Sequence, residues 1–108
     1  MTASMAIEFA PFGVRINALS PGLIDTLIWQ QIQAAAADKD AVIQHWMDNI
    51  PLGRVGTPRE MGQVALFLAS DEASYVTGAN ILADGGMTSL LTNRERFTSQ
   101  ALEGQYKS

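Results

Sequence analysis

Apolar residues recur at every fourth position at the start of the chain. Met1, Met5 and Phe9 would share one side of a helix, so the spacing predicts a helix over residues 2–9 with a narrow apolar stripe. Pro11 then ends the helical pattern.

The next apolar run predicts a strand over residues 14–19. Its apolar residues alternate as the two-residue repeat of a strand requires. Arg15 and Asn17 interrupt the run, so one face or one end of this strand should meet polar groups.

Helical periodicity returns over residues 27–50, with a charged interruption at residues 38–40. The pattern fits two short helices or one broken helix. Trp29 and Trp46 lie one in each half. Two tryptophans on such a segment fit either a lid over an apolar ligand or simple packing against the rest of the fold.

A well-marked helix follows over residues 58–69. Thr57 is its predicted N-cap, Pro58 occupies the first turn, and Glu60 completes a capping box. Four residues spaced for one helical side form its predicted buried face: Met61, Val64, Ala65 and Leu68.

The pattern ends with a second strand over residues 80–83, closed by the turn Asp84-Gly85-Gly86. Apolar periodicity is lost from Met87, so we expect a C-terminal tail over residues 87–108. The turn could bind a metal or a phosphate, although a strand-ending turn is the simpler interpretation.

The order of elements is helix, strand, helical loop, helix, strand and tail, which is typical of an α/β fold. Two strands joined through a helix within one sheet should be parallel. Parallel strands are normally covered by helices on both faces and flanked by further strands. We therefore expect the chain to be a piece of a larger parallel sheet.

Composition excludes several classes of function. The 108 residues carry a net charge of −4, which argues against a nucleic-acid partner. The chain has no cysteine and only one histidine, so disulfides and metal sites built on Cys or His clusters are excluded. Since no apolar run approaches the ~18 residues of a membrane span and no secretion signal is evident, we expect a cytoplasmic protein.

Residues 17–26 contain the candidate for ligand binding, because they lead from the first predicted strand into a Pro-Gly turn. In open α/β sheets, ligands bind at the carboxyl edge, where such turns lie. Pro21 fixes its own φ and Gly22 permits close approach of another group. From the spacing alone, an ordinary strand-ending turn remains the alternative.

Several sequence blocks together resemble the short-chain dehydrogenase/reductase family over about residues 3–86. The blocks are Ala6-x-Glu8-Phe9-Ala10-Pro11-x-Gly13-Val14-Arg15-Ile16-Asn17, Ser20-Pro21-Gly22-x-Ile24-x-Thr26, Pro51-Leu52-Gly53-Arg54-x-Gly56-x-Pro58-x-Glu60, Phe67-Leu68-Ala69-Ser70 and Thr77-Gly78-x-x-Ile81-x-x-Asp84-Gly85-Gly86. They match the C-terminal part of the classical members in order and spacing.

The resemblance implies the C-terminal part of a Rossmann-type, doubly wound parallel sheet over residues 1–86. It implies NAD or NADP as cofactor and a small alcohol or carbonyl compound as substrate. The implied cofactor-binding residues are Pro21, Gly22, Leu23, Ile24 and Thr26. Backbone groups near Ile24 would bind the nicotinamide carboxamide, and Thr26 would bind the carboxamide or pyrophosphate region.

Residues 27–50 correspond to the family's variable substrate-binding loop, which makes Leu27, Ile28 and Trp29 candidates for the pocket wall. Core packing is the alternative for these three. Asn17 is expected to be a structural hydrogen-bonding residue. The resemblance also implies a homo-oligomer, a dimer or tetramer, formed through the helix over residues 58–69 and the strand over residues 80–83.

The family's catalytic residues have no counterpart in this sequence. The glycine-rich phosphate loop, the catalytic Ser and the Tyr-x-x-x-Lys pair are absent, and neither Tyr75 nor Tyr106 has Lys four residues later. We therefore assign no catalytic or metal-binding residue and expect the isolated chain to be inactive. A non-catalytic segment that serves only oligomerisation or interaction is the alternative.

Overall fold

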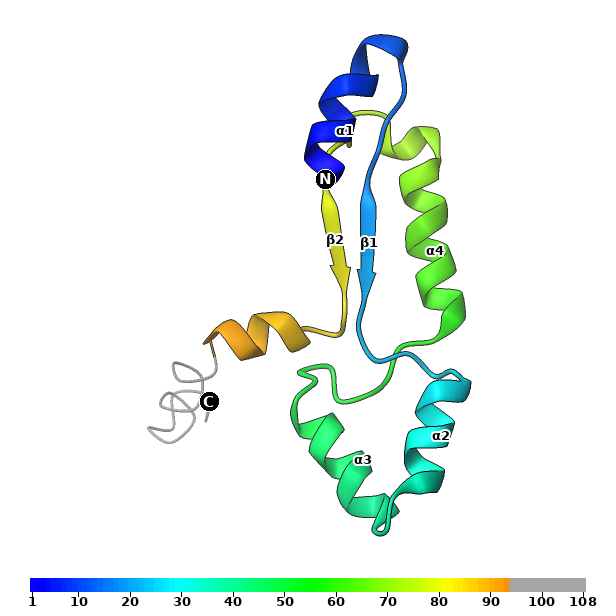
Figure 1. Cartoon of the computed structure of the whole chain (residues 1–108), viewed down its shortest axis with the longest axis vertical. Coiled ribbons are helices and arrows are strands. Elements are labelled where there is room, and N and C mark those ends of the chain that lie inside the picture. Colours follow the sequence, from blue (N-terminus) through cyan, green and yellow to red (C-terminus); the bar gives the residue numbers. More distant parts are fainter. Residues whose placement is uncertain (94–108) are drawn as a thin grey trace, which may run out of the picture.

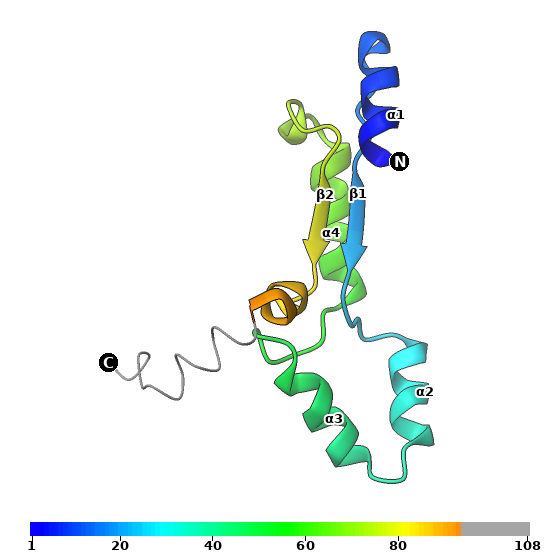
Figure 2. The ribbon, with the colours of Figure 1, turned by 60° about the vertical axis from the view of Figure 1, so that its left-hand side comes forward.

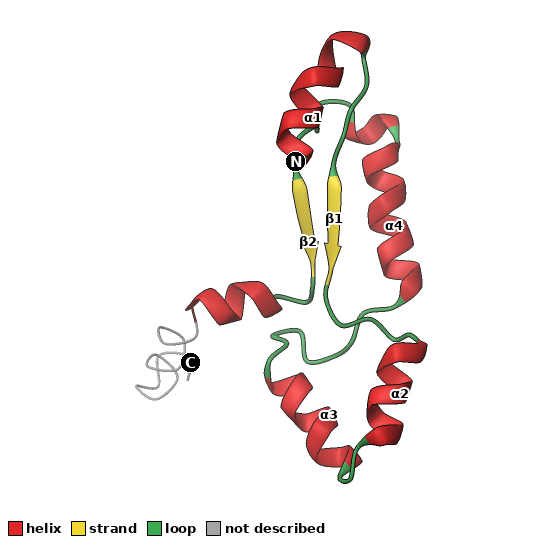
Figure 3. Cartoon of the chain, in the orientation of Figure 1, coloured by secondary structure: helices red, strands yellow, loops and turns green. Residues whose placement is uncertain are grey.

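The computed structural model describes residues 1–93 and has two parallel strands with one helix alongside them and further helices beyond their ends (Figure 1). A further helical segment covers residues 87–93. Figure 3 shows the same chain coloured by secondary structure. In chain order the elements are α1 (Thr2–Phe9), η1 (Ala10–Phe12), β1 (Ala18–Pro21), α2 (Leu27–Ala35), α3 (Lys39–Asp48), α4 (Pro58–Ala69), η2 (Asp71–Ala73) and β2 (Asn80–Ala83).

The two strands pair in parallel, which confirms the predicted α/β arrangement. Ala18 lies opposite Asn80 and Pro21 lies opposite Ala83. In two views, α4 runs alongside the strands, whereas α1 lies near their amino ends (Figures 1 and 2). Helices α2 and α3 form a hairpin beyond the carboxyl ends of both strands.

The first strand begins later than predicted, at Ala18 instead of residue 14. The preceding residues use their hydrogen bonds elsewhere. The Arg15 guanidinium donates to the carbonyl oxygens of Leu68, Ser70 and Val76 at 2.9, 2.9 and 3.1 Å. These contacts join residues 14–17 to the end of α4 in place of a regular strand ladder.

Asn17 is a structural residue, as predicted. Its side-chain amide donates to the Val76 carbonyl oxygen at 3.0 Å, and its Oδ1 accepts from the Ala79 amide at 3.0 Å. The Ala18 amide then donates to the Ala79 carbonyl at 2.9 Å. Asn17 therefore sets the register in which β1 meets β2.

The predicted apolar faces are only partly buried. Helix α1 has the predicted bounds, but its apolar stripe of Met1, Met5 and Phe9 is exposed and the helix buries Ala6. Ala6 packs near Gly78, just before β2. Of the face predicted on α4, Leu68 is buried, Met61 and Val64 are half-buried, and Ala65 is exposed. Two short strands cover too little of either helix to bury a full stripe.

The capping box predicted for α4 is confirmed. The Glu60 amide donates to the Thr57 hydroxyl at 3.1 Å, and the Thr57 amide donates to the Glu60 carboxylate at 3.0 Å. Residues 27–50 form two helices, and the interruption has a physical cause. Asp38 caps α3 by accepting a hydrogen bond from the Ala41 amide at 3.1 Å.

Within the predicted C-terminal tail, residues 87–93 form a helix. This helix forms without apolar periodicity and is capped at its start, where the Asp84 carboxylate accepts a hydrogen bond from the Thr88 amide at 3.0 Å. Residues 94–108 of that prediction lie outside the described part of the chain.

The core of residues 1–93 is small. Five hydrophobic residues are buried there: Ala6, Trp29, Ile50, Leu68 and Ala73. The radius of gyration is 17.9 Å, whereas a compact domain of similar length has about 13 Å. Within the described residues, none of the helices has the length and apolar character needed to cross a bilayer.

The strands end in a close contact at Gly22. The Gly22 amide donates to the Ala83 carbonyl at 3.1 Å. A Cβ atom at position 22 would lie 2.6 Å from the Asp84 Cβ and 2.7 Å from its Cα. Since backbone atoms cannot move aside as a flexible side chain can, only glycine fits here.

We predict that Gly22→Ala lowers the free energy of unfolding by about 1–3 kcal/mol, as expected for overpacking. Gly62→Ala is the matched control, because an added Cβ there meets nothing within 4 Å. It should raise stability by up to about 1 kcal/mol through helix propensity. Urea unfolding followed by far-UV circular dichroism measures both effects, and equal midpoints for Gly22→Ala and the wild type would contradict the first.

Candidate functional site

The carboxyl ends of β1 and β2 lie at one edge of the sheet, and the predicted cofactor-binding segment begins there. Pro21 is the last residue of β1 and lies opposite Ala83. The close contact between Gly22 and Asp84 then fixes the point at which the chain leaves the sheet. The structure thus brings Pro21, Gly22, Leu23, Ile24 and Thr26 to the edge where open α/β sheets bind ligands.

The segment after Gly22 is held by a short parallel bridge to the loop before α4. Ile24 pairs with Gly56 in this bridge. The Gly56 amide donates to the Leu23 carbonyl at 3.0 Å, and the Asp25 amide donates to the Gly56 carbonyl at 2.8 Å. Leu23 and Asp25 therefore direct their backbone groups toward the loop.

The backbone of Ile24 faces the other way. Successive residues of an extended segment direct their N–H and C=O groups to opposite sides. Because the Leu23 carbonyl and the Asp25 amide point toward Gly56, the N–H and C=O of Ile24 point away from it. Neither group forms a hydrogen bond within residues 1–93. Ile24 thus presents an adjacent donor and acceptor to a ligand.

Thr26 lies at the N-cap position of α2, but its hydroxyl does not cap the helix. The residue is exposed, and its carbonyl accepts a hydrogen bond from the Gln30 amide at 3.1 Å. Within residues 1–93 the hydroxyl has no hydrogen-bond partner. It is available to a ligand beside Ile24.

The three predicted substrate-contacting residues lie in different environments. Leu27 and Ile28 are 67% and 69% exposed, at the start of α2. Trp29 is only 4% exposed and packs edge-on against Trp46, with ring centroids 6.4 Å apart. Trp29 therefore joins α2 to α3 inside the hairpin, whereas Leu27 and Ile28 remain free to contact a substrate.

The turn Asp84-Gly85-Gly86 has a structural explanation. The Asp84 carboxylate accepts hydrogen bonds from the Gly86 and Thr88 amides, both at 3.0 Å. Hydrogen bonds from Thr88, and a weaker one from Gly86, lower the pKa of Asp84. The carboxylate thus caps the segment over residues 87–93, which favours the strand-ending turn over a metal or phosphate site.

The two glycines of this turn seat the end of the helical hairpin. Both have positive φ, +63° at Gly85 and +91° at Gly86. A Cβ atom would lie 2.8 Å from the Ile50 side chain at Gly85 and 2.9 Å from Pro51 at Gly86. The Leu52 amide also donates to the Gly85 carbonyl at 3.0 Å. Sequence analysis missed this packing, since nothing in the spacing joins residues 50–52 to the turn.

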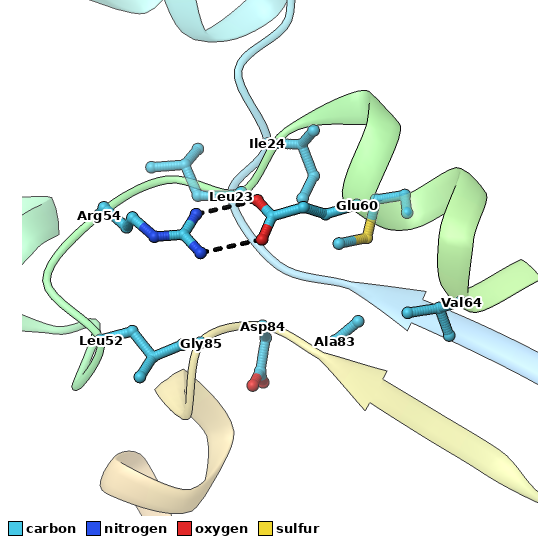
Figure 4. Close-up of a pocket in the computed structure, with 11 residues that line it drawn as sticks. Leu23, Ile24, Leu52, Arg54, Glu60, Val64, Ala83, Asp84 and Gly85 are labelled. Atoms are coloured by element: carbon cyan, nitrogen blue, oxygen red, sulfur yellow. Dashed lines mark hydrogen bonds and ion pairs between the residues drawn. The ribbon is translucent and has the colours of Figure 1, made fainter.

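A half-open cavity of about 200 Å³ lies behind the bridge (Figure 4). Its lining comes from the bridge, the loop before α4, the start of α4 and the end of β2. The lining residues are Leu23, Ile24, Leu52, Arg54, Gly56, Glu60, Met61, Val64, Ala83, Asp84 and Gly85.

An ion pair between Arg54 and Glu60 forms one wall of the cavity. The two guanidinium nitrogens lie 2.9 Å from the two carboxylate oxygens. Hydrogen bonds from Arg54 and then from the Thr57 amide lower the pKa of Glu60 to about 2. Sequence analysis recognised Glu60 only as a capping residue. The spacing of Arg54 and Glu60 on either side of the cap is the signal that could have indicated the pair.

The tyrosine of the described part of the chain lies away from this edge. Tyr75 precedes β2, so it lies toward the amino end of the sheet, and its side chain is fully exposed. Over residues 1–93, no group of three or more His, Cys, Asp or Glu side chains could hold a metal ion. The site offers backbone and hydroxyl hydrogen bonds, which suit an uncharged polar group.

We predict that the Arg54–Glu60 pair makes stability pH-dependent in acid. Since folding lowers the pKa of Glu60 from its ordinary 4.5 to about 2, the stabilisation is complete above about pH 4.5 and disappears as the pH falls toward 2. Glu60→Gln should flatten the decline of the urea midpoint over this window. An unchanged slope in the variant would contradict the prediction.

Comparison with known proteins gives the family. The family model described as Enoyl-(Acyl carrier protein) reductase matches residues 1–88. Galactitol 2-dehydrogenase (L-tagatose-forming) of Cereibacter sphaeroides is 43% identical over 88 residues, which are 82% of this chain and 33% of that enzyme. The chain therefore spans about a third of the length of such curated relatives.

Solved structures agree with the fold. A putative short-chain dehydrogenase/reductase from Burkholderia xenovorans has a TM-score of 0.75 and 38% identity, over 82% of this chain and 34% of that one. The structure of 4-hydroxyisoleucine dehydrogenase complexed with NADH has a TM-score of 0.73 and 32% identity, over 82% and 35%. On its sequence blocks, its fold and these matches, the chain belongs to the short-chain dehydrogenase/reductase family.

Proposed function

We propose that this chain supplies the nicotinamide-side part of an NAD(P)-dependent oxidoreductase that interconverts an alcohol and a carbonyl compound. The observation that carries the proposal is the free N–H and C=O of Ile24 at the carboxyl edge of the sheet. A nicotinamide carboxamide has one carbonyl acceptor and one amino donor group. It can therefore pair with both backbone groups of a single residue.

Neighbouring residues complete this half of the site. Gly22 leaves no side chain at the strand end, and the unpaired hydroxyl of Thr26 can bind the carboxamide or a pyrophosphate oxygen. Leu27 and Ile28 provide an exposed apolar wall for a substrate beside the ring. When bound, the nicotinamide supplies or accepts the hydride.

The proton transfer would require residues outside this sequence. In the family, Tyr-x-x-x-Lys exchanges the proton with the substrate oxygen, and the lysine lowers the tyrosine pKa. That motif is absent from these 108 residues, and the chain spans a third of its relatives. We therefore propose that the chain acts within a longer polypeptide or together with one.

Similarity to named proteins supports a nicotinamide cofactor. Galactitol 2-dehydrogenase is a dehydrogenase by name, and 4-hydroxyisoleucine dehydrogenase was solved with NADH. The proposal extends to NAD and NADP alike, because the family resemblance assigns the contacts with the adenosine ribose to residues upstream of this sequence.

The proposal predicts that the chain binds NADH or NADPH only when joined to the rest of the fold. The isolated chain should give no saturable cofactor fluorescence at micromolar protein. A chimaera of galactitol 2-dehydrogenase, in which this chain replaces the aligned segment, should bind one of the two. Thr26→Ala in the chimaera should raise Kd about threefold to tenfold, the loss of one hydrogen bond.

Thr26→Ser is the matched control for the chimaera, because it keeps the hydroxyl and should keep the affinity. A folded chimaera that binds neither cofactor would overturn the proposed function. Saturable binding by the isolated chain would show that the upstream part is not required.

A second candidate function is association through α4 and β2. Leu66, Phe67 and Leu82 are exposed apolar residues on these two elements. Exposed large apolar side chains on these two elements favour contact with another copy of the chain. In this alternative the chain is an oligomerisation segment without a cofactor.

This candidate predicts a dimer or tetramer in light scattering. Leu66→Asp should shift the protein toward monomer, because burying the new carboxylate is costly. Leu27→Asp, at an equally exposed leucine on α2, should leave the mass unchanged. A monomeric wild type would contradict the candidate function.

A further inference from the structure

We propose that Arg54 is a positioning residue that fixes the direction of the Ile24 backbone groups through the peptide between Val55 and Gly56. Nothing in the family resemblance assigns this role to Arg54. The link to cofactor binding rests on the proposed function, whereas the geometric link from Arg54 to Ile24 can be tested without a cofactor.

The first step is a rigid reference at the start of α4. Glu60 takes part in the capping box with Thr57, so its carboxylate is held from the helix side by the Thr57 amide at 3.0 Å and the Thr57 hydroxyl at 3.2 Å. Pro58 fixes the first helical turn. The carboxylate that receives Arg54 is thus anchored by the helix N-terminus.

The second step is the fork of the Arg54 guanidinium. Two parallel contacts of 2.9 Å to the Glu60 oxygens set both its position and its plane. The same Nη1 also donates to the Val55 carbonyl oxygen at 3.2 Å. Figure 4 shows the pair beside Leu23 and Ile24, with the Asp84 side chain directed away from it. Arg54 therefore joins the start of α4 to the peptide between Val55 and Gly56, which belongs to the preceding loop.

The third step lies within that one peptide group. Its carbonyl, from Val55, accepts from Arg54, and its N–H, from Gly56, donates to the Leu23 carbonyl at 3.0 Å. Holding the carbonyl fixes the direction of the N–H, because the peptide is planar. A charged donor on the carbonyl also polarises the N–H and strengthens its bond to Leu23.

The fourth step brings the constraint to Ile24. The Gly56 carbonyl accepts from the Asp25 amide at 2.8 Å, so Ile24 is held on both sides. The approach is close, since a Cβ at Gly56 would lie 3.0 Å from the Ile24 Cδ1. With its neighbours turned toward the loop, Ile24 must direct its own N–H and C=O outward.

Lysine would not replace arginine in this role. An ammonium group is a single point charge on a flexible stem, and it cannot hold two carboxylate oxygens in a fixed plane while also reaching Val55. Methionine keeps the length and apolar contacts of the stem and removes all three hydrogen bonds. Arg54→Lys keeps the positive charge without the planar fork, and Arg54→Met removes both, so the two variants together separate the effect of charge from that of geometry.

The test is amide hydrogen exchange in the full 108-residue chain. In Arg54→Met, the Asp25 and Gly56 amides should exchange about tenfold faster than in the wild type, because local opening becomes easier. Arg54→Lys should fall between the two. The Ala18 amide, which donates to Ala79 in the strand pair, should keep its rate and so exclude global unfolding.

Arg59→Met is the matched control, because it removes an exposed arginine next to Glu60 and should leave all three amides unchanged. Three outcomes overturn the proposal. They are equal rates in Arg54→Met and the wild type, equal acceleration at Ala18, and an absence of protection at Gly56 in the wild type.

A second measurement uses the chimaera with galactitol 2-dehydrogenase. There Arg54→Met should raise the cofactor KM about tenfold and leave kcat within about twofold, the pattern of lost positioning in binding. A chimaera that binds no cofactor counts against the proposed function, while the exchange result still decides the role of Arg54. Faster exchange in Arg54→Met together with an unchanged KM would overturn the link to the cofactor.

Discussion

Three backbone oxygens converge on the guanidinium of Arg15, and the placement of the sheet depends on them. Two belong to Leu68 and Ser70 at the end of α4, and the third belongs to Val76 on the way to β2. The last carbonyls of a helix lack partners within it, and a positive charge there is favourable. A single side chain thus ties together β1, α4 and β2, which the sequence keeps far apart.

Local signals predicted elements well where side chains cap or terminate them. The helix over residues 58–69 carries its own capping box, and residues 80–83 lie between clear turns, so both were predicted with the bounds found. The first strand was misplaced, because Arg15 and Asn17 bind distant backbone groups that no local pattern announces. Apolar periodicity predicted more buried residues than the structure has. It identifies the apolar side of a helix but does not show whether another element packs against that side.

The candidate site was predicted through family resemblance more than through periodicity. Residues 21–26 were identified by their motif, but the free backbone groups of Ile24 follow from its bridge to Gly56, a contact that requires tertiary structure. The hydrogen bond from Arg54 to the Val55 carbonyl was not predicted for a related reason. All backbone carbonyls are chemically equivalent acceptors, so the sequence does not indicate which one a side chain reaches. The sequence did not distinguish Trp29 from Leu27 and Ile28, whereas the structure buries Trp29 and leaves the other two exposed.

The hairpin of α2 and α3 is closed at both ends and packed within itself. At one end the Asp25 amide donates to the Gly56 carbonyl, and at the other the Leu52 amide donates to the Gly85 carbonyl. Between the two helices, Trp29 packs against Trp46. Under the proposed function, this arrangement separates two evolutionary tasks, since residues 27–50 can vary with the substrate while the backbone of Ile24, which would face the cofactor, keeps its bridge to Gly56.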